Sequence, residues 1–222
     1  MPIFTKPDAA ASFPIDTTTP FHPTKALYIA DTTELSLTIT ITDITPILSS
    51  PSIHNPVENP EPLLKLAKST ASTLPAILTL TRPTHLSRTW TATDPRSNTK
   101  LAELSNPLWS LGKWTIKFPS DSPHSSHDIY LHPAGFATKA DEFVKDSVPY
   151  FWDVLDGRRL CKLYKATEGR RVEVGRFVGE GVRAREGVLL IEGEGNAGEG
   201  VDEVVVGVTF LGVLMRVDSF RA

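Results

Sequence analysis

The chain has 222 residues, of which 40% are apolar, and carries a net charge of −3 with an isoelectric point near 6.1. This length suits one domain, or one domain with a loose arm, and the acidic balance argues against a dedicated nucleic-acid binder. The single cysteine, Cys161, excludes an intramolecular disulfide framework and fits a reducing compartment. We therefore expect a cytoplasmic protein with no nucleic-acid partner.

Residues 1–24 contain five prolines and show no sustained hydrophobic period. They have neither the uninterrupted apolar core of a signal peptide nor the arginine-rich, amphipathic pattern of a mitochondrial presequence. We predict a flexible or surface-lying N-terminal arm over 1–24, followed by one domain over 25–222.

From Ala26 onward, short apolar runs separated by turn residues are typical of β-structure. The run LSLTITIT (35–42) alternates strictly, which predicts a strand with one buried face made of Leu35, Leu37, Ile39 and Ile41. KWTIKF (113–118) repeats this alternation: the inward residues are Trp114, Ile116 and Phe118, and the outward residues are Lys113, Thr115 and Lys117. Further strands are predicted at 26–30, 76–81, 88–93, 100–104, 128–132, 142–146, 149–155, 159–167, 170–178 and 187–192.

The segment 45–75 interrupts this series of strands. It is rich in proline and serine, in SSPSIHNPVENPEP, and continues as LLKLAKST. The composition predicts a long loop insertion that holds one short element.

The closing run 204–215 has no charged side chain, and its one polar residue is Thr209. As a helix its 12 residues would span about 18 Å, whereas a bilayer crossing needs roughly 20 apolar residues, so we expect no transmembrane span. The run lacks alternation and contains two glycines, and as a helix it would be apolar on every face. A central helix is therefore favoured over a buried strand, although the many valines are mediocre helix formers.

About a dozen antiparallel strands followed by such a helix predict a mainly β fold, a closed barrel around a central C-terminal helix. Four stretches strengthen this prediction: PYFWDVLDGRRL (149–160), RRVEVGRFVGEG (170–181), GVLLIEGEG (187–195) and VDEVVVGVTFLGVLMR (201–216). In order and spacing they resemble the last strands and core helix of the tubby-like C-terminal fold. That superfamily includes tubby proteins, phospholipid scramblases and plant LURP-one-related proteins, and the chain is most similar to its uncharacterised fungal members.

The resemblance implies peripheral lipid binding. Tubby domains bind phosphoinositides through basic side chains on the barrel exterior, and scramblases act at membranes. Scramblases also carry a palmitoylated cysteine cluster, which a chain with one cysteine lacks. The resemblance therefore implies headgroup binding at membranes, while the missing cysteine cluster argues against carrying scramblase activity over to this chain.

Basic residues are concentrated near the end of the chain. Residues 157–185 contain nine basic and three acidic side chains, an excess of six positive charges, whereas 186–203 contain six acids and no base. Either the basic strands attract anionic headgroups, or neighbouring strands pair the opposite charges across the barrel wall. The candidate headgroup residues in this stretch are Arg158, Arg159, Lys162, Lys165, Arg170, Arg171, Arg176, Arg183 and Arg185. The resemblance to tubby proteins, whose basic positions lie in the middle strands, adds Lys113 and Lys117. Arg176 shares its parity with buried valines, so we predict a bulge at Gly175 that turns it outward.

Three other patterns suggest chemistry and are better explained by structure. GEGNAG (193–198) matches a dinucleotide-binding loop, but too few residues follow the helix for a second parallel strand, so we expect no cofactor. His124, His127 and His132 form a weak metal-site candidate in a loop rich in serine and proline. Cys161 lies among basic residues, yet a strand cysteine between leucines is typical of inert packing. We assign no catalytic residue.

The resulting hypothesis is a non-enzymatic protein that binds anionic phospholipid headgroups, phosphoinositides above all, at the surface of the barrel. One alternative is a protein-interaction scaffold that uses the proline-rich arm and the 45–75 insertion. A small-ligand carrier or an enzyme is the third possibility, and it requires an open cavity.

Overall fold

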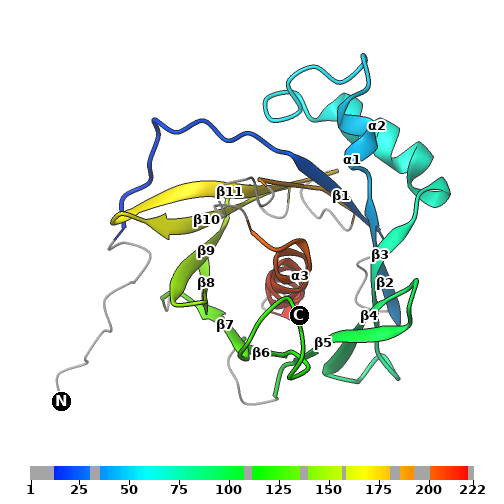
Figure 1. Ribbon diagram of the computed structural model, residues 1–222, viewed down its shortest axis with the longest axis vertical. Helices are drawn as coiled ribbons and strands as arrows, with labels where there is room; N and C mark the ends of the chain where they lie inside the picture. Colours follow the sequence, from blue (N-terminus) through cyan, green and yellow to red (C-terminus); the bar gives the residue numbers. More distant parts are fainter. Residues whose placement is uncertain are drawn as a thin grey trace.

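The computed structural model describes residues 13–30, 36–107, 112–135, 140–156, 159–180, 186–192 and 201–219. The chain folds into a closed antiparallel barrel of twelve strands around one helix (Figure 1). The strands are β1 (Lys25–Ala30), β2 (Thr38–Asp43), β3 (Ala76–Thr81), β4 (Thr89–Asp94), β5 (Thr99–Ser105), β6 (Trp114–Lys117), β7 (Ile129–Pro133), β8 (Ala140–Lys145), β9 (Val148–Val154), β10 (Leu160–Thr167), β11 (Arg170–Gly179) and β12 (Gly187–Ile191). The helices are α1 (Thr45–Leu48), α2 (Glu61–Thr70) and α3 (Glu203–Ser219), with a 3₁₀ turn at Ala71–Thr73. Each strand pairs with its neighbours in sequence, and β1 closes the ring against β12.

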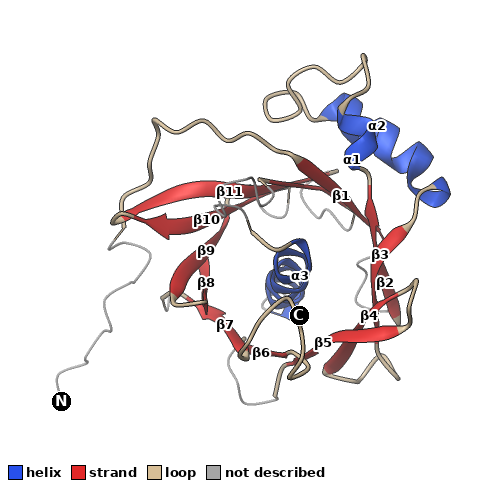
Figure 2. Cartoon of the chain, in the orientation of Figure 1, coloured by secondary structure: helices blue, strands red, loops and turns tan. Residues whose placement is uncertain are grey.

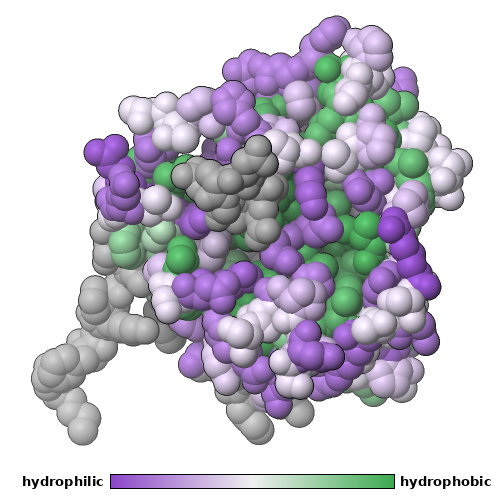
Figure 3. Space-filling view, viewed as in Figure 1, coloured by the Kyte–Doolittle hydropathy of each residue, from purple (hydrophilic) through white to green (hydrophobic). Residues whose placement is uncertain are grey.

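The closing apolar run is confirmed as a helix, and α3 passes through the middle of the barrel (Figure 2). Every side chain from Val204 to Leu214 is at most 6% exposed. Burial on all sides stabilises a helix that valine propensity alone would disfavour, because each valine gains apolar contacts in this position. In the end-on view of Figure 3, hydrophilic residues cover most of the outline and hydrophobic residues gather toward the barrel centre.

The one polar residue within the apolar run, Thr209, is fully satisfied inside the core. Its Oγ1 donates to the Val205 carbonyl oxygen at 2.8 Å and accepts the indole N–H of Trp152 at 3.2 Å. Phe210 lies beside it, with its ring centroid 5.0 Å from that of Trp152 and 4.4 Å from that of Phe177. These contacts with Trp152 of β9 and Phe177 of β11 fix the orientation of α3 about its own axis.

A buried ion pair holds the last turns of α3. Arg216 Nη2 donates to Asp141 Oδ2 at 2.7 Å, and Arg216 Nε lies 2.7 Å from Asp141 Oδ1. Asp141 is the second residue of β8 and is fully buried. Burial raises the pKa of its carboxyl to about 6, although Arg216 opposes this rise.

The 45–75 insertion is more helical than its composition predicted. Helices α1 and α2 lie on the outside of the barrel, where Leu63 and Ala67 pack on β1 and β12 (Figure 2). The five residues of β12 are therefore buried on both faces: Leu189 and Ile191 face the barrel core, and Val188 and Leu190 face the insertion. This explains why GVLLI lacks the alternation of the other strands.

Two local predictions have different outcomes. The strand predicted from residue 35 begins at Thr38, and Leu37, at the edge of the strand, is 39% exposed instead of buried. Leu35 lies outside the described residues. The bulge predicted beside Gly175 is confirmed, since Leu163 pairs with Gly175 and Tyr164 with Glu173, which leaves Val174 as the extra residue. Beyond it, Arg176 contacts groups outside the barrel, as predicted.

Candidate functional site

The candidate headgroup residues do not form one surface. Lys162 and Arg176 lie on the outer wall, and Lys165, Arg170 and Arg171 lie near the β10–β11 turn. Lys113 precedes β6, Lys117 ends it, and Arg159 precedes β10. Arg158, Arg183 and Arg185 are outside the described residues. Lys113, Lys117, Arg159 and Arg170 are exposed, whereas the other described members are half-buried.

The wall residues are engaged with an acid of the same sheet. Lys162 Nζ donates to Glu173 Oε2 at 2.9 Å, and Arg176 Nε donates to Glu173 Oε1 at 2.6 Å. Lys162 and Arg176 face each other directly in the β10–β11 register, so the one carboxylate bridges two neighbouring cations. This is the charge pairing that the sequence offered as the alternative to a headgroup site.

The N-terminal arm lies on the barrel over residues 13–24, and Arg171 holds it there. The arm pairs with β11 through the N–H of Asp16, which donates to the Arg171 carbonyl oxygen at 2.9 Å, and through the Arg171 N–H, which donates to the Pro14 carbonyl oxygen at 2.9 Å. The Arg171 guanidinium donates to the Phe13 carbonyl oxygen at 2.9 Å. It also lies 5.7 Å from the ring centroid of Phe151, which Phe13 contacts. Arg171 is therefore occupied by the chain itself.

The arm, the insertion and the barrel wall together enclose a groove of about 650 Å³. One wall is the arm strap, residues 15–23, and the other is the loop around Val57. The floor is made by Lys162, Tyr164, Glu173 and Arg176 of β10 and β11. This volume is within the range of small-molecule sites, which is about 300–1,000 Å³. The proline-rich arm and the 45–75 insertion, the two segments that the scaffold hypothesis named, thus both line this groove.

A second surface lies at one end of the barrel, and no pattern in the sequence indicates it. In a closed antiparallel ring, the β1–β2, β3–β4, β5–β6 and β9–β10 connections all lie at the same end. Three leucines of these connections are exposed: Leu37 by 39%, Leu86 by 92% and Leu155 by 49%. We call this surface the leucine end. A lone leucine in a polar loop has no period, so pattern analysis gave no signal for it.

Exposed cations accompany these leucines. Arg88 follows Leu86 in the β3–β4 connection, Lys113 precedes β6, and Arg159 follows Leu155 in the β9–β10 connection. Two exposed acids, Asp156 and Glu180, also lie at this end, and Glu180 forms an ion pair with Lys68 at 3.2 Å. The described part of the leucine end thus combines apolar tips with basic side chains.

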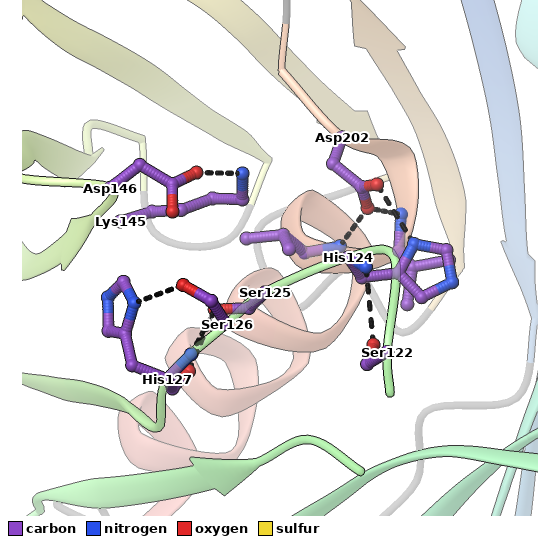
Figure 4. Close-up of polar contacts among 10 residues, drawn as sticks. Ser122, His124, Ser125, Ser126, His127, Lys145, Asp146 and Asp202 are labelled. Carbon is purple, nitrogen blue, oxygen red and sulfur yellow. Dashed lines mark hydrogen bonds and ion pairs between the residues drawn. The ribbon is translucent and has the colours of Figure 1, made fainter. Parts of the chain in front are cut away.

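The three histidines do not form a common site. At the opposite end of the barrel, His124 Nδ1 lies 2.9 Å from Asp202 Oδ2 (Figure 4). His127 turns away toward Ser126, and its Nδ1 is 3.4 Å from the Ser126 hydroxyl. His132, on β7, lies 3.4 Å from Glu142 Oε1. Among the described residues, no group of three or more His, Cys, Asp or Glu side chains is placed to hold a metal ion.

Asp202 is the cap of α3, which explains its contact with His124. Its Oδ1 accepts the backbone N–H groups of Val204 and Val205 at 2.9 and 3.0 Å, and this satisfies two donors at the start of the helix (Figure 4). His124 and Asp202 therefore fasten a loop to the beginning of the central helix.

Cys161 is fully buried in the barrel core, which is the inert packing that the sequence predicted. The GEGNAG stretch (193–198) lies outside the described residues.

Comparison with known proteins adds no relative. No protein-family model, curated protein or solved structure matches this chain. Within the described ranges, no helix combines the length and the apolar character that crossing a membrane requires.

Proposed function

We propose that this protein is a non-enzymatic, tubby-like barrel of the cytoplasm that binds anionic membrane surfaces reversibly through its leucine end. The observation that carries the proposal is the combination of three exposed leucines and three exposed cations at one end of the barrel. Peripheral membrane binding draws on both features, because apolar tips enter the interface while cations attract anionic headgroups.

The expected strength of this binding is modest. Arg88, Lys113 and Arg159 would each contribute about 1 kcal/mol near an anionic leaflet. Transfer of the Leu86 side chain from water into the interface would add about 2 kcal/mol. These contributions, reduced by the repulsion of the exposed Asp156 and Glu180 at the same end, support weak, reversible association that falls with rising salt.

Two arguments support the wider assignment. A closed twelve-strand barrel with a C-terminal helix through it is the arrangement that the tubby-like resemblance implies, and it makes phosphoinositides the first headgroups to test. The leucine end is favoured over the barrel wall because Lys162, Arg171 and Arg176 are engaged with the chain itself. A lumen filled by α3 leaves little room for a substrate, which favours binding over catalysis.

Flotation with phosphatidylcholine vesicles, with and without phosphatidylserine or a phosphoinositide, tests the proposal. Leu86→Ser is expected to lower the partition coefficient about 30-fold, and neutralising Arg88, Lys113 and Arg159 to Gln about 100-fold. Val144→Ser is the matched control, because Val144 is an exposed apolar residue on the barrel wall. Equal flotation with neutral and anionic vesicles at every salt concentration would exclude this function.

A further inference from the structure

The floor of the groove presents hydrogen-bond donors that the protein does not use. Lys162 gives Glu173 one of its three ammonium protons, and Arg176 uses Nε for Glu173 and Nη1 for the Val57 carbonyl oxygen, 3.0 Å away. Arg176 Nη2 and the Tyr164 hydroxyl have no hydrogen-bond partner in the described part of the chain. Burial raises the pKa of Tyr164 to about 12, so its hydroxyl stays protonated and able to donate at neutral pH.

The charge on this floor is positive. Two cations share the single carboxylate of Glu173, and all three side chains are largely withdrawn from water. Asp16 and Glu58 also line the groove, but their carboxylates are engaged locally, Asp16 with Thr18 and Thr19 and Glu58 with Asn55. Because these acids belong to the more exposed rim, water screens them better than it screens the floor. A second anionic group is the ligand that such a floor would accept.

The walls above the floor mix apolar and polar side chains, and the apolar ones come from both sides of the groove. Phe21, Pro20 and Ile15 come from the arm strap, and Leu48 and Val57 come from the insertion. The strap is fixed at both ends, by its pairing with Arg171 and by the Thr24 N–H, which donates to the Ile191 carbonyl oxygen at 3.0 Å. Phe21 also lies against Arg176, with the guanidinium carbon 5.5 Å from its ring centroid. A ligand with an anionic group and an apolar body could therefore place the anionic group on the floor and the apolar body against the apolar wall residues.

We propose that the groove beneath the arm strap binds a small amphiphilic anion: a carboxylate, sulfonate or phosphate monoester on an apolar body. The anionic group contacts Lys162, Arg176 and Tyr164, and the apolar body packs between Phe21 and Val57. This site is separate from the leucine end and is independent of membrane binding. Glu173 holds the two cations in place and at the same time competes with the ligand for them.

Titration of the full-length protein with the aromatic sulfonate 1-anilinonaphthalene-8-sulfonate, followed by fluorescence, tests this site. One saturable site is expected, and Lys162→Met or Arg176→Met should weaken it about tenfold to a hundredfold, the range of a lost charge-assisted hydrogen bond. Lys117→Met, an exposed cation outside the groove, should leave the affinity unchanged. Absence of saturable binding to the folded protein, or equal losses in all three variants, would overturn the proposal.

Glu173→Gln separates ligand binding from groove stability. If the cations only maintain the groove, this variant loses affinity like the others, which would overturn the proposal. If they bind the ligand, removing the competing carboxylate strengthens binding by about tenfold even where the melting temperature falls. Leu86→Ser should leave the sulfonate affinity unchanged and Arg176→Met should leave vesicle flotation unchanged, so the two sites can fail separately.

Displacement of the bound sulfonate identifies the source of the anion. Phenyl phosphate, phenylacetate and soluble dihexanoyl phosphatidic acid should each displace it. Displacement by the phosphatidic acid alone would contradict a small-molecule site and assign the groove to a lipid headgroup. Inorganic phosphate at the same concentration should not, because it lacks a body for Phe21 and Val57. Displacement by inorganic phosphate as strong as by phenyl phosphate would contradict the amphiphile and leave a simple ion site.

Discussion

The two glycines of α3 allow a direct test of how the helix sits in the barrel. A methyl group added at Gly212 would lie 2.7 Å from Leu131 Cδ2 and 3.5 Å from Trp114 Cγ. One added at Gly207 would lie 3.1 Å from Ile41 Cδ1 and 3.5 Å from Leu78 Cδ2. The first distance is too short for carbon atoms and requires Leu131 to move, whereas the second requires a shift of a few tenths of an ångström.

Two opposing effects set the expected magnitude. Replacing glycine by alanine within a helix stabilises it by about 1 kcal/mol, and overpacking a core costs about 1–3 kcal/mol. Leu131 is buried against α3, so its displacement falls toward the upper part of that range. We expect Gly212→Ala to reduce the free energy of unfolding by about 1–2 kcal/mol, and Gly207→Ala to change it by less than about 1 kcal/mol.

Urea unfolding of both variants, followed by far-ultraviolet circular dichroism, measures this difference. Leu131→Ala in the Gly212→Ala background provides the matching double-mutant cycle, because it removes the atom that the new methyl group meets. Leu131→Ala alone should cost about 2–5 kcal/mol, and the double variant should be more stable than additivity predicts. A Gly212→Ala protein as stable as Gly207→Ala, or more so, would refute the packing of α3 against β6 and β7.

Three further outcomes follow from single contacts. In Arg216→Met, Asp141 loses the cation that lowers its pKa, so its folded-state pKa rises above about 6. A carboxyl with a raised pKa stabilises the folded state at low pH, and this stabilisation is lost as the pH rises through the folded-state pKa. The free energy of unfolding, measured against pH, should therefore be slightly below that of the wild type near pH 4 and about 3–5 kcal/mol below it above pH 7. Arg171→Ala removes the hydrogen bond to Phe13, so limited proteolysis should cleave the arm strap faster than in the wild type, while Arg170→Ala, beside it and exposed, should not. Asp202→Ala removes the cap of α3 and should lower the free energy of unfolding by about 1–2 kcal/mol in thermal melts. If only the loop that holds His124 loses order and the free energy of unfolding is unchanged, the role of Asp202 as a cap is contradicted.

The barrel strands were predictable because their signal is local. In KWTIKF the side chains alternate within six residues, and Trp114 and Ile116 are buried while Lys113 and Lys117 are exposed, as expected. LSLTITIT shows the limit of the same rule, since alternation does not say where pairing starts. Leu37 continues the pattern but lies outside the ladder and is exposed.

The candidate sites were less predictable because their contacts join distant segments. The basic stretch suggested a headgroup surface, yet the β10–β11 register places Lys162 and Arg176 on the same carboxylate. Arg171 reaches Phe13 across 158 residues, and Arg176 reaches Val57 across 119. No pattern along the chain encodes partners at such separations.

Local patterns were enough to predict a β-rich chain that ends in an apolar helix, because side-chain period and helix apolarity are properties of neighbouring residues. The meeting of the arm and the insertion over β10 and β11, and the position of three leucines at one end of the barrel, are instead properties of the folded chain. Both features depend on closure of the barrel, which brings together residues that are remote in the chain. Closure thereby determines which charges form ion pairs and which hydrogen-bond donors remain available to a ligand.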